Sequence, residues 1–190
     1  MTRKIPVWKI TLGGVLTAFG ILLPQLFHIF GPAAGKMLLP MHLCVFVGGM
    51  VLGPLFGSCV GVLTPLASFL LTGMPGVPTV FFMVVELAAY GCFAGLFYRR
   101  WRQNLMVSLL LSQLCGRLIY ALLLYAAGGL FRLPVPGAAT VLAAVGTGLP
   151  GILLQLVMVP AMVLALGKVS ERFGIDIRRK KSSTENSCQV

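Results

Sequence analysis

Long apolar runs, separated by short polar or Gly-Pro-rich breaks, dominate this chain and predict membrane-spanning helices. Most of them are about as long as the core of a bilayer requires. Six runs can be drawn, at about 10–30, 37–53, 55–72, 80–98, 104–128 and 138–166. The last run exceeds one span and is interrupted at Gly148–Gly151, so we expect a kinked or tilted helix with a short helical lead-in. The pattern predicts an all-α membrane protein, a six-transmembrane-helix bundle.

The basic residues predict how this bundle lies in the membrane. With both ends on one side, twelve Lys and Arg fall on that side, and two, Lys36 and Arg132, fall on the other. The twelve are Arg3, Lys4, Lys9, Arg99, Arg100, Arg102, Lys168, Arg172 and the run 178–181. Cytoplasmic loops are enriched in Lys and Arg, so we expect both termini to be cytoplasmic. Residues 1–168 form the bundle in this prediction, and 169–190 form a basic, disordered cytoplasmic tail.

Composition narrows the class of protein further. Of the 190 residues, 58% are hydrophobic and only 10% are charged, against about 25% charged in a typical soluble domain. The formal charge of +11 lies mainly at the ends of apolar runs, which favours contact with anionic lipid and not with nucleic acid. The first run is too long for the core of a signal peptide, so we interpret it as the first span.

Few chemical motifs are present. The five cysteines form no C-x-x-C pair and no cluster with His, so no metal site and no cofactor is expected. The chain has no phosphate-binding G-x-x-x-x-G-K-[ST], no H-E-x-x-H and no G-x-S-x-G sequence. It therefore does not bind ATP in the Walker manner, and we expect a protein that is not an enzyme.

Polar side chains gather in the half of the bundle nearer the expected outer face. Ionisable groups inside a membrane are costly and usually functional. The candidate substrate-binding residues are His42 in the second run, Thr64 and Ser68 in the third, Glu86 and Tyr90 in the fourth, and Arg117 in the fifth. Gln113 and Tyr120 share a helix face with Arg117. Their similar depth predicts a cavity open to the outside and closed toward the cytoplasm.

Each of these features also has a structural explanation. The Thr64 hydroxyl can bond back to its own helix, and Glu86 with Arg117 can be a purely structural ion pair. Glycines recur at intervals of four at 49, 53, 57 and 61, and again at 91 and 95. Such a stripe of small residues favours close packing between neighbouring spans, with contact to a partner protein as the alternative.

Several ordered blocks carry a family resemblance: 39–42 (LPMH), 49–57, 63–66 (LTPL), 71–75 (LTGMP), 82–91 and 116–117 (GR). They resemble the substrate-binding S components of energy-coupling factor (ECF) vitamin transporters. The resemblance implies a six-helix subunit in the bacterial cell membrane that works with a transmembrane coupling protein and two ATPase subunits. It implies that loops 31–36 and 73–79 cover the substrate. It also implies docking on the partner through Gly14 and Ala18, the nearest match to the family's Ala-x-x-x-Ala.

These observations predict a subunit that captures a water-soluble vitamin or precursor from outside. Arg117 and His42 suit a carboxylate or phosphate-like group, and Glu86 balances Arg117 or accepts hydrogen bonds from the ligand. Pantothenate is the first candidate, followed by pyridoxine-type, folate or deazapurine ligands. Two alternatives stay open. One is a ligand-free scaffold whose polar stripes satisfy one another, and the other is an intramembrane enzyme that uses Glu86 and His42 as acid and base.

Overall fold

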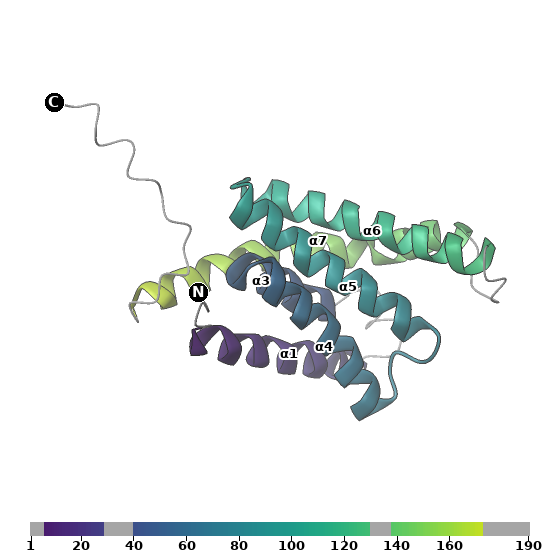
Figure 1. Cartoon of the computed structure of the whole chain (residues 1–190), viewed down its shortest axis with the longest axis horizontal. Helices are drawn as coiled ribbons and strands as arrows, with labels where there is room; N and C mark the ends of the chain where they lie inside the picture. The colour runs from purple at the N-terminus through teal and green to yellow at the C-terminus, as the bar shows by residue number, and fades with distance from the viewer. Residues whose placement is uncertain (1–5, 29–39, 130–137, 173–190) are drawn as a thin grey trace, which may run out of the picture.

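The chain folds into a bundle of long helices. The computed structural model describes residues 6–28, 40–129 and 138–172. In chain order the helices are α1 (Val7–His28), α3 (Pro40–Leu52), α4 (Pro54–Thr72), α5 (Thr79–Gly95), the π-helical turn η1 (Leu96–Arg100), α6 (Leu105–Gly129) and α7 (Ala138–Arg172) (Figure 1). Within these described ranges there is no β-strand, which confirms the all-α prediction.

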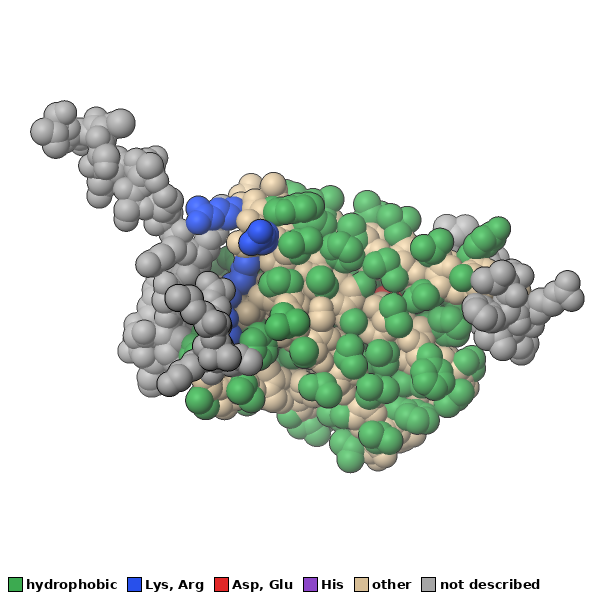
Figure 2. Space-filling view, viewed as in Figure 1, with side chains coloured by type: hydrophobic (Ala, Val, Ile, Leu, Met, Phe, Trp, Pro, Cys, Tyr) green, Lys and Arg blue, Asp and Glu red, His purple; other side chains and the backbone are tan. Residues whose placement is uncertain are grey.

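Among the described residues, five helical segments are long and apolar enough to cross a membrane. They are Val7–Leu26, Pro54–Thr72, Thr79–Arg100, Leu105–Gly128 and Gly148–Val169. Apolar side chains cover much of the outer surface between the two ends of the bundle, as expected for a surface in contact with lipid (Figure 2). The chain is therefore a multi-pass membrane protein. The second predicted span corresponds to α3, which has 13 described residues, and residues 37–39 lie outside the described ranges. The count of six spans stays a prediction.

The breaks around α4 follow from Gly and Pro. Gly53 has φ +102°, a backbone conformation that residues with a Cβ rarely adopt. Pro54 occupies the start of α4, where its missing N–H costs nothing. At the other end Gly73 has φ +71°, and its N–H donates to the Phe69 carbonyl at 2.8 Å. The predicted stops at Gly53-Pro54 and Gly73 are confirmed.

A seam of glycines brings α3, α4 and α5 into close contact. A Cβ placed on Gly57 would lie 2.9 Å from the Gly49 nitrogen, and one on Gly91 would lie 2.9 Å from the Ser58 nitrogen. Backbones this close leave no room for side chains at these positions. The stripe predicted from sequence thus serves packing within the chain, and it fixes the rotation of these three helices about their axes.

Successive helices run in alternating directions along the bundle. The start of α1, the turn after η1 and the end of α7 lie together at the left of Figure 1, and the loop between α4 and α5 lies at the opposite end. Lys and Arg side chains are visible at the same left end (Figure 2). This arrangement fits the predicted topology, in which that end faces the cytoplasm. Helix α7 continues through Gly148–Gly151, so its lead-in is helical as expected.

Candidate functional site

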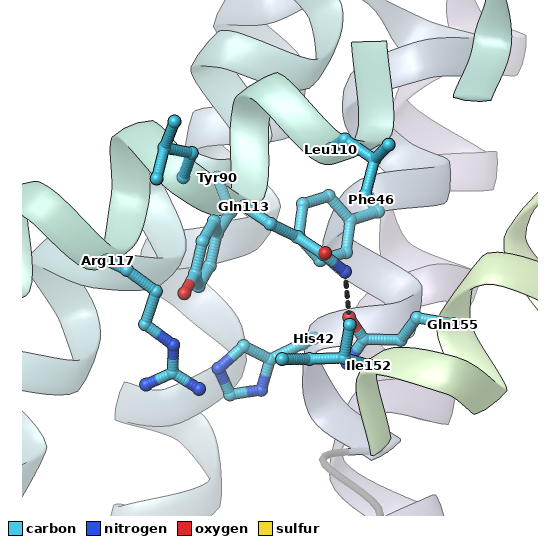
Figure 3. Close-up of a pocket in the computed structure, with 9 residues that line it drawn as sticks. His42, Phe46, Tyr90, Leu110, Gln113, Arg117, Ile152 and Gln155 are labelled. Carbon is cyan, nitrogen blue, oxygen red and sulfur yellow. Dashed lines mark hydrogen bonds between the residues drawn. The ribbon is translucent and has the colours of Figure 1, made fainter. Parts of the chain in front are cut away.

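A cavity of about 270 Å³ lies between four helices (Figure 3). His42 and Phe46 come from α3, Tyr90 from α5, Leu110, Gln113, Leu114 and Arg117 from α6, and Ile152 and Gln155 from α7. Three of the six residues predicted to bind substrate, His42, Tyr90 and Arg117, therefore line one space. The cavity combines apolar walls with a few polar groups that point into it, which is the usual composition of a small-molecule site.

Directly behind the cavity wall, Glu86 joins Arg117 and Tyr90 in one network. The Arg117 Nη1 atom lies 3.1 Å from Glu86 Oε1, and the Tyr90 hydroxyl donates a hydrogen bond of 2.8 Å to the same oxygen. Glu86 is only 4% exposed, so its charge depends on these two partners. The approach of Glu86 and Arg117, which the sequence suggested, is present.

His42 is the polar residue in this wall whose side chain makes no hydrogen bond to the described residues. It is 3% exposed, and neither of its ring nitrogens has a hydrogen-bond partner within the described part of the chain. Its ring lies against Tyr90, with centroids 5.4 Å apart, and faces the cavity near Arg117 (Figure 3). A buried polar group without a hydrogen bond costs about 1–3 kcal/mol, which makes the two ring nitrogens of His42 a notable feature of this wall.

Two amides link the opposite sides of the cavity. Gln113 Nε2 on α6 donates to Gln155 Oε1 on α7 at 2.8 Å (Figure 3). Gln113 shares a helix face with Arg117, as its spacing predicted. Gln155 was not predicted as a site residue. A lone amide in an otherwise apolar run is the signal that could have indicated it.

The orientation of Tyr90 depends on a glycine. A Cβ at Gly116 would collide with the Tyr90 ring, because even the more distant ring atom Cζ would lie only 3.0 Å away. The absence of a side chain at Gly116 lets the ring lie close to α6 while its hydroxyl reaches Glu86. Phe46 and Tyr90 together form an aromatic wall of the cavity, with ring centroids 5.0 Å apart.

Thr64 and Ser68 do not line this cavity. Thr64 is fully buried, its hydroxyl donates to the Val60 carbonyl at 2.7 Å, and its methyl group faces Gly20 of α1. The Ser68 hydroxyl donates to the Met74 carbonyl at 2.9 Å and ties the loop after α4 to that helix. Their hydroxyls are used within the chain, and a role in substrate binding stays a prediction for both.

The predicted docking pair lies on the outer side of α1. Gly14 and Ala18 are both exposed, and a Cβ at Gly14 would meet nothing within 4 Å in the part of the chain that the structure describes. This face is open to a partner. Of the two loops expected to cover the substrate, 73–79 follows α4 and 31–36 lies outside the described residues.

Comparison with known proteins identifies the family. The sequence model of the family "ECF transporter, substrate-specific component" matches residues 9–163. No curated protein and no solved structure matches the chain. Members of this family are substrate-binding subunits of transporters and not enzymes, and they work with an ECF module made of a T protein and ATPases.

Proposed function

Because the chain belongs to the substrate-specific components of ECF transporters, we propose that it captures a water-soluble vitamin or vitamin precursor from outside the cell. A transmembrane coupling protein and two ATPase subunits then drive the bound substrate inward. The sequence ranks pantothenate first among the ligands, with pyridoxine-type, folate and deazapurine ligands next. The protein acts in the bacterial plasma membrane with both termini in the cytoplasm.

One observation carries the assignment of the capture site. His42 is buried, its two ring nitrogens have no hydrogen-bond partner among the described residues, and it faces a cavity of about 270 Å³ beside Arg117. The imidazole gives up hydrogen bonds to water when the chain folds and receives none from the described residues. A ligand in the cavity supplies them. Tyr90 and Arg117 form the neighbouring walls, and Glu86 holds both in position.

Thr64 and Ser68 then act on the substrate indirectly. Ser68 holds the loop after α4 through Met74, at the end of the bundle opposite the turn after η1. Thr64 packs against Gly20 and so helps to hold α1 beside α4. Loop 73–79 covers the cavity once the substrate has entered.

The two alternatives account for less of the structure. A ligand-free scaffold explains Glu86 with Arg117 and Gln113 with Gln155, which satisfy each other, but it leaves His42 unexplained. An enzyme with Glu86 as acid or base requires a carboxylate that can exchange its proton with a substrate. Glu86 Oε1 instead accepts from Tyr90 and pairs with Arg117, as a structural carboxylate does.

The test is ligand binding to the purified full chain. Thermal unfolding in detergent is measured with each of a panel of water-soluble vitamins and their precursors, and a ligand that binds the folded state raises the midpoint. His42→Ala should lower affinity for the stabilising compound at least tenfold. Ser108→Ala is the matched control, because Ser108 Oγ is also buried without a hydrogen-bond partner among the described residues but does not line the cavity. Equal loss of affinity in both variants, or no loss in either, contradicts the assignment.

A further inference from the structure

The full charges around the cavity already balance among the described residues. Arg117 is the only charged group that lines it there, and Glu86 pairs with Arg117 from behind at 3.1 Å. A negatively charged ligand would be attracted by the guanidinium and repelled by the carboxylate at nearly the same place. It would leave a net negative charge in a buried site, which is costly. The remaining N–H groups of Arg117 can instead donate to a neutral carbonyl or ring nitrogen.

The polar groups that line the cavity favour a ligand with both a hydrogen-bond donor and a hydrogen-bond acceptor. A neutral imidazole has one N–H and one acceptor nitrogen, and both ring nitrogens of His42 lack hydrogen-bond partners in the described part of the chain. Carboxylate and phosphate oxygens only accept, so either would leave the acceptor nitrogen of a neutral His42 unsatisfied. An amide-like edge, with N–H beside C=O or beside a ring nitrogen, satisfies both. The amides of Gln113 and Gln155 complete a polar wall without adding charge.

The walls and the size of the cavity favour a flat, small molecule. Phe46 and Tyr90 present tilted aromatic rings with centroids 5.0 Å apart, and Leu110, Leu114 and Ile152 form the apolar remainder. Aromatic walls of this kind suit the faces of a planar ring. The volume of about 270 Å³ lies just under the usual range of ligand pockets, roughly 300–1,000 Å³. One or two fused rings fit such a space, whereas a molecule of folate size does not.

From charge, hydrogen bonding and shape together, we infer that the substrate is an uncharged planar nitrogen heterocycle of one or two rings, with a hydrogen-bond donor beside an acceptor. This inference rests on the proposed function and specifies the substrate class of the same site. It changes the order that the sequence suggested. Pyridoxine-type and deazapurine rings belong to the inferred class, whereas pantothenate carries a carboxylate and no ring.

Pairs of compounds that differ only in charge test the inference directly. Nicotinamide and nicotinate share one ring and differ in a carboxamide against a carboxylate, and panthenol and pantothenate form the matched pair without a ring. Pyridoxine, hypoxanthine and 7-deazaguanine extend the panel of neutral rings. Affinities are measured by equilibrium dialysis with the purified full chain. Small molecules that are released when the chain is denatured are identified by mass spectrometry as a second measurement.

We expect a neutral ring to bind best, at least tenfold tighter than any anion, and His42→Ala to abolish that preference. Glu86→Gln leaves Arg117 unbalanced, so it should raise the affinity for nicotinate relative to nicotinamide about tenfold. Tighter binding of pantothenate or nicotinate to the unmodified chain overturns the substrate class but leaves the proposed function intact, provided that binding depends on His42. A chain that binds no panel compound and releases no small molecule overturns both.

Discussion

Arg117 and Glu86 form an ion pair that joins α6 to α5 beside the cavity, with Nη1 and Oε1 3.1 Å apart. Their side chains are 18% and 5% exposed, so water screens the pair poorly. Removing one partner of such a pair leaves an uncompensated charge, which costs more than the pair itself contributes to stability. The ion pair therefore holds two walls of the cavity and also sets its net charge.

A double-mutant cycle separates these two roles. Glu86→Gln and Arg117→Gln should each lower the free energy of unfolding by roughly 3–5 kcal/mol, because each leaves a buried charge alone. The double variant should lose less than the sum of the single changes, since no full charge remains. Unfolding is followed by denaturant titration in detergent. Additive losses would show that the two side chains do not interact, contrary to the structure.

Ligand binding by the same variants measures the second role. The double variant should bind the preferred ligand more weakly than the unmodified chain, because the ligand loses the Arg117 donor even where stability is regained. Wild-type affinity in a stable double variant would make the pair purely structural and would exclude Arg117 as a ligand contact.

Gly116 is predicted to control the cavity through Tyr90. The Cβ of Gly116→Ala collides with the Tyr90 ring, so the ring must move toward the cavity or α6 must move away from α5. We expect a loss of about 1–3 kcal/mol in the free energy of unfolding from overpacking, with weaker ligand binding. Gly146→Ala in α7 is the matched control, because a Cβ there meets nothing within 4 Å among the described residues. Its loss of stability should be small or reversed. Equal effects of the two changes would contradict the packing described for Tyr90.

The sequence predicted where helices end more reliably than it predicted which way they face. The ends at Gly53-Pro54 and Gly73 depend on backbone conformations that Gly and Pro impose locally. The rotation of each helix depends on contacts between distant segments. The glycine seam turns α4 so that Thr64 faces Gly20 of α1, away from the cavity. Equal depth in the membrane therefore did not bring Thr64 to the same space as His42.

For the same reason, the sequence predicted only part of the candidate site. Charged groups inside apolar runs are rare enough that Glu86 and Arg117 stand out, and their contact follows from the high cost of leaving either alone. The aromatic and aliphatic walls, such as Phe46 and Ile152, look like any other apolar residue of a span. Only the packing of α7 against α3 and α6 shows that these two line a cavity.

The topology can be tested by labelling single cysteines in a chain otherwise free of them. A cysteine at Arg100 should react with a membrane-impermeant maleimide only after the cells are permeabilised, because the basic bias places that turn in the cytoplasm. A cysteine at Gly76, an exposed position in the loop after α4, should react in intact cells and serves as the matched position. The reverse labelling pattern would show that the bundle has the opposite orientation in the membrane. Labelling of both positions in intact cells would rule out the alternating arrangement of α4 and α5.

The outer face of α1 gives the last prediction. Gly14 and Ala18 are exposed, and nothing in the described chain lies within 4 Å of a Cβ at Gly14. Gly14→Leu and Ala18→Trp should therefore leave the stability and ligand affinity of the isolated subunit nearly unchanged. If this face packs closely against the coupling protein, the same variants should abolish uptake, because helices that approach closely need small residues.

Uptake of radiolabelled substrate into cells that contain the whole transporter, with binding to the purified subunit measured in parallel, checks this prediction. Phe19→Leu, an exposed position beside Ala18 that stays apolar, is the control for a change on the lipid-facing surface. Normal uptake by Gly14→Leu and Ala18→Trp would place the docking surface elsewhere. Joint loss of binding and uptake would mean that the face serves packing within this chain, which the open space beside Gly14 argues against.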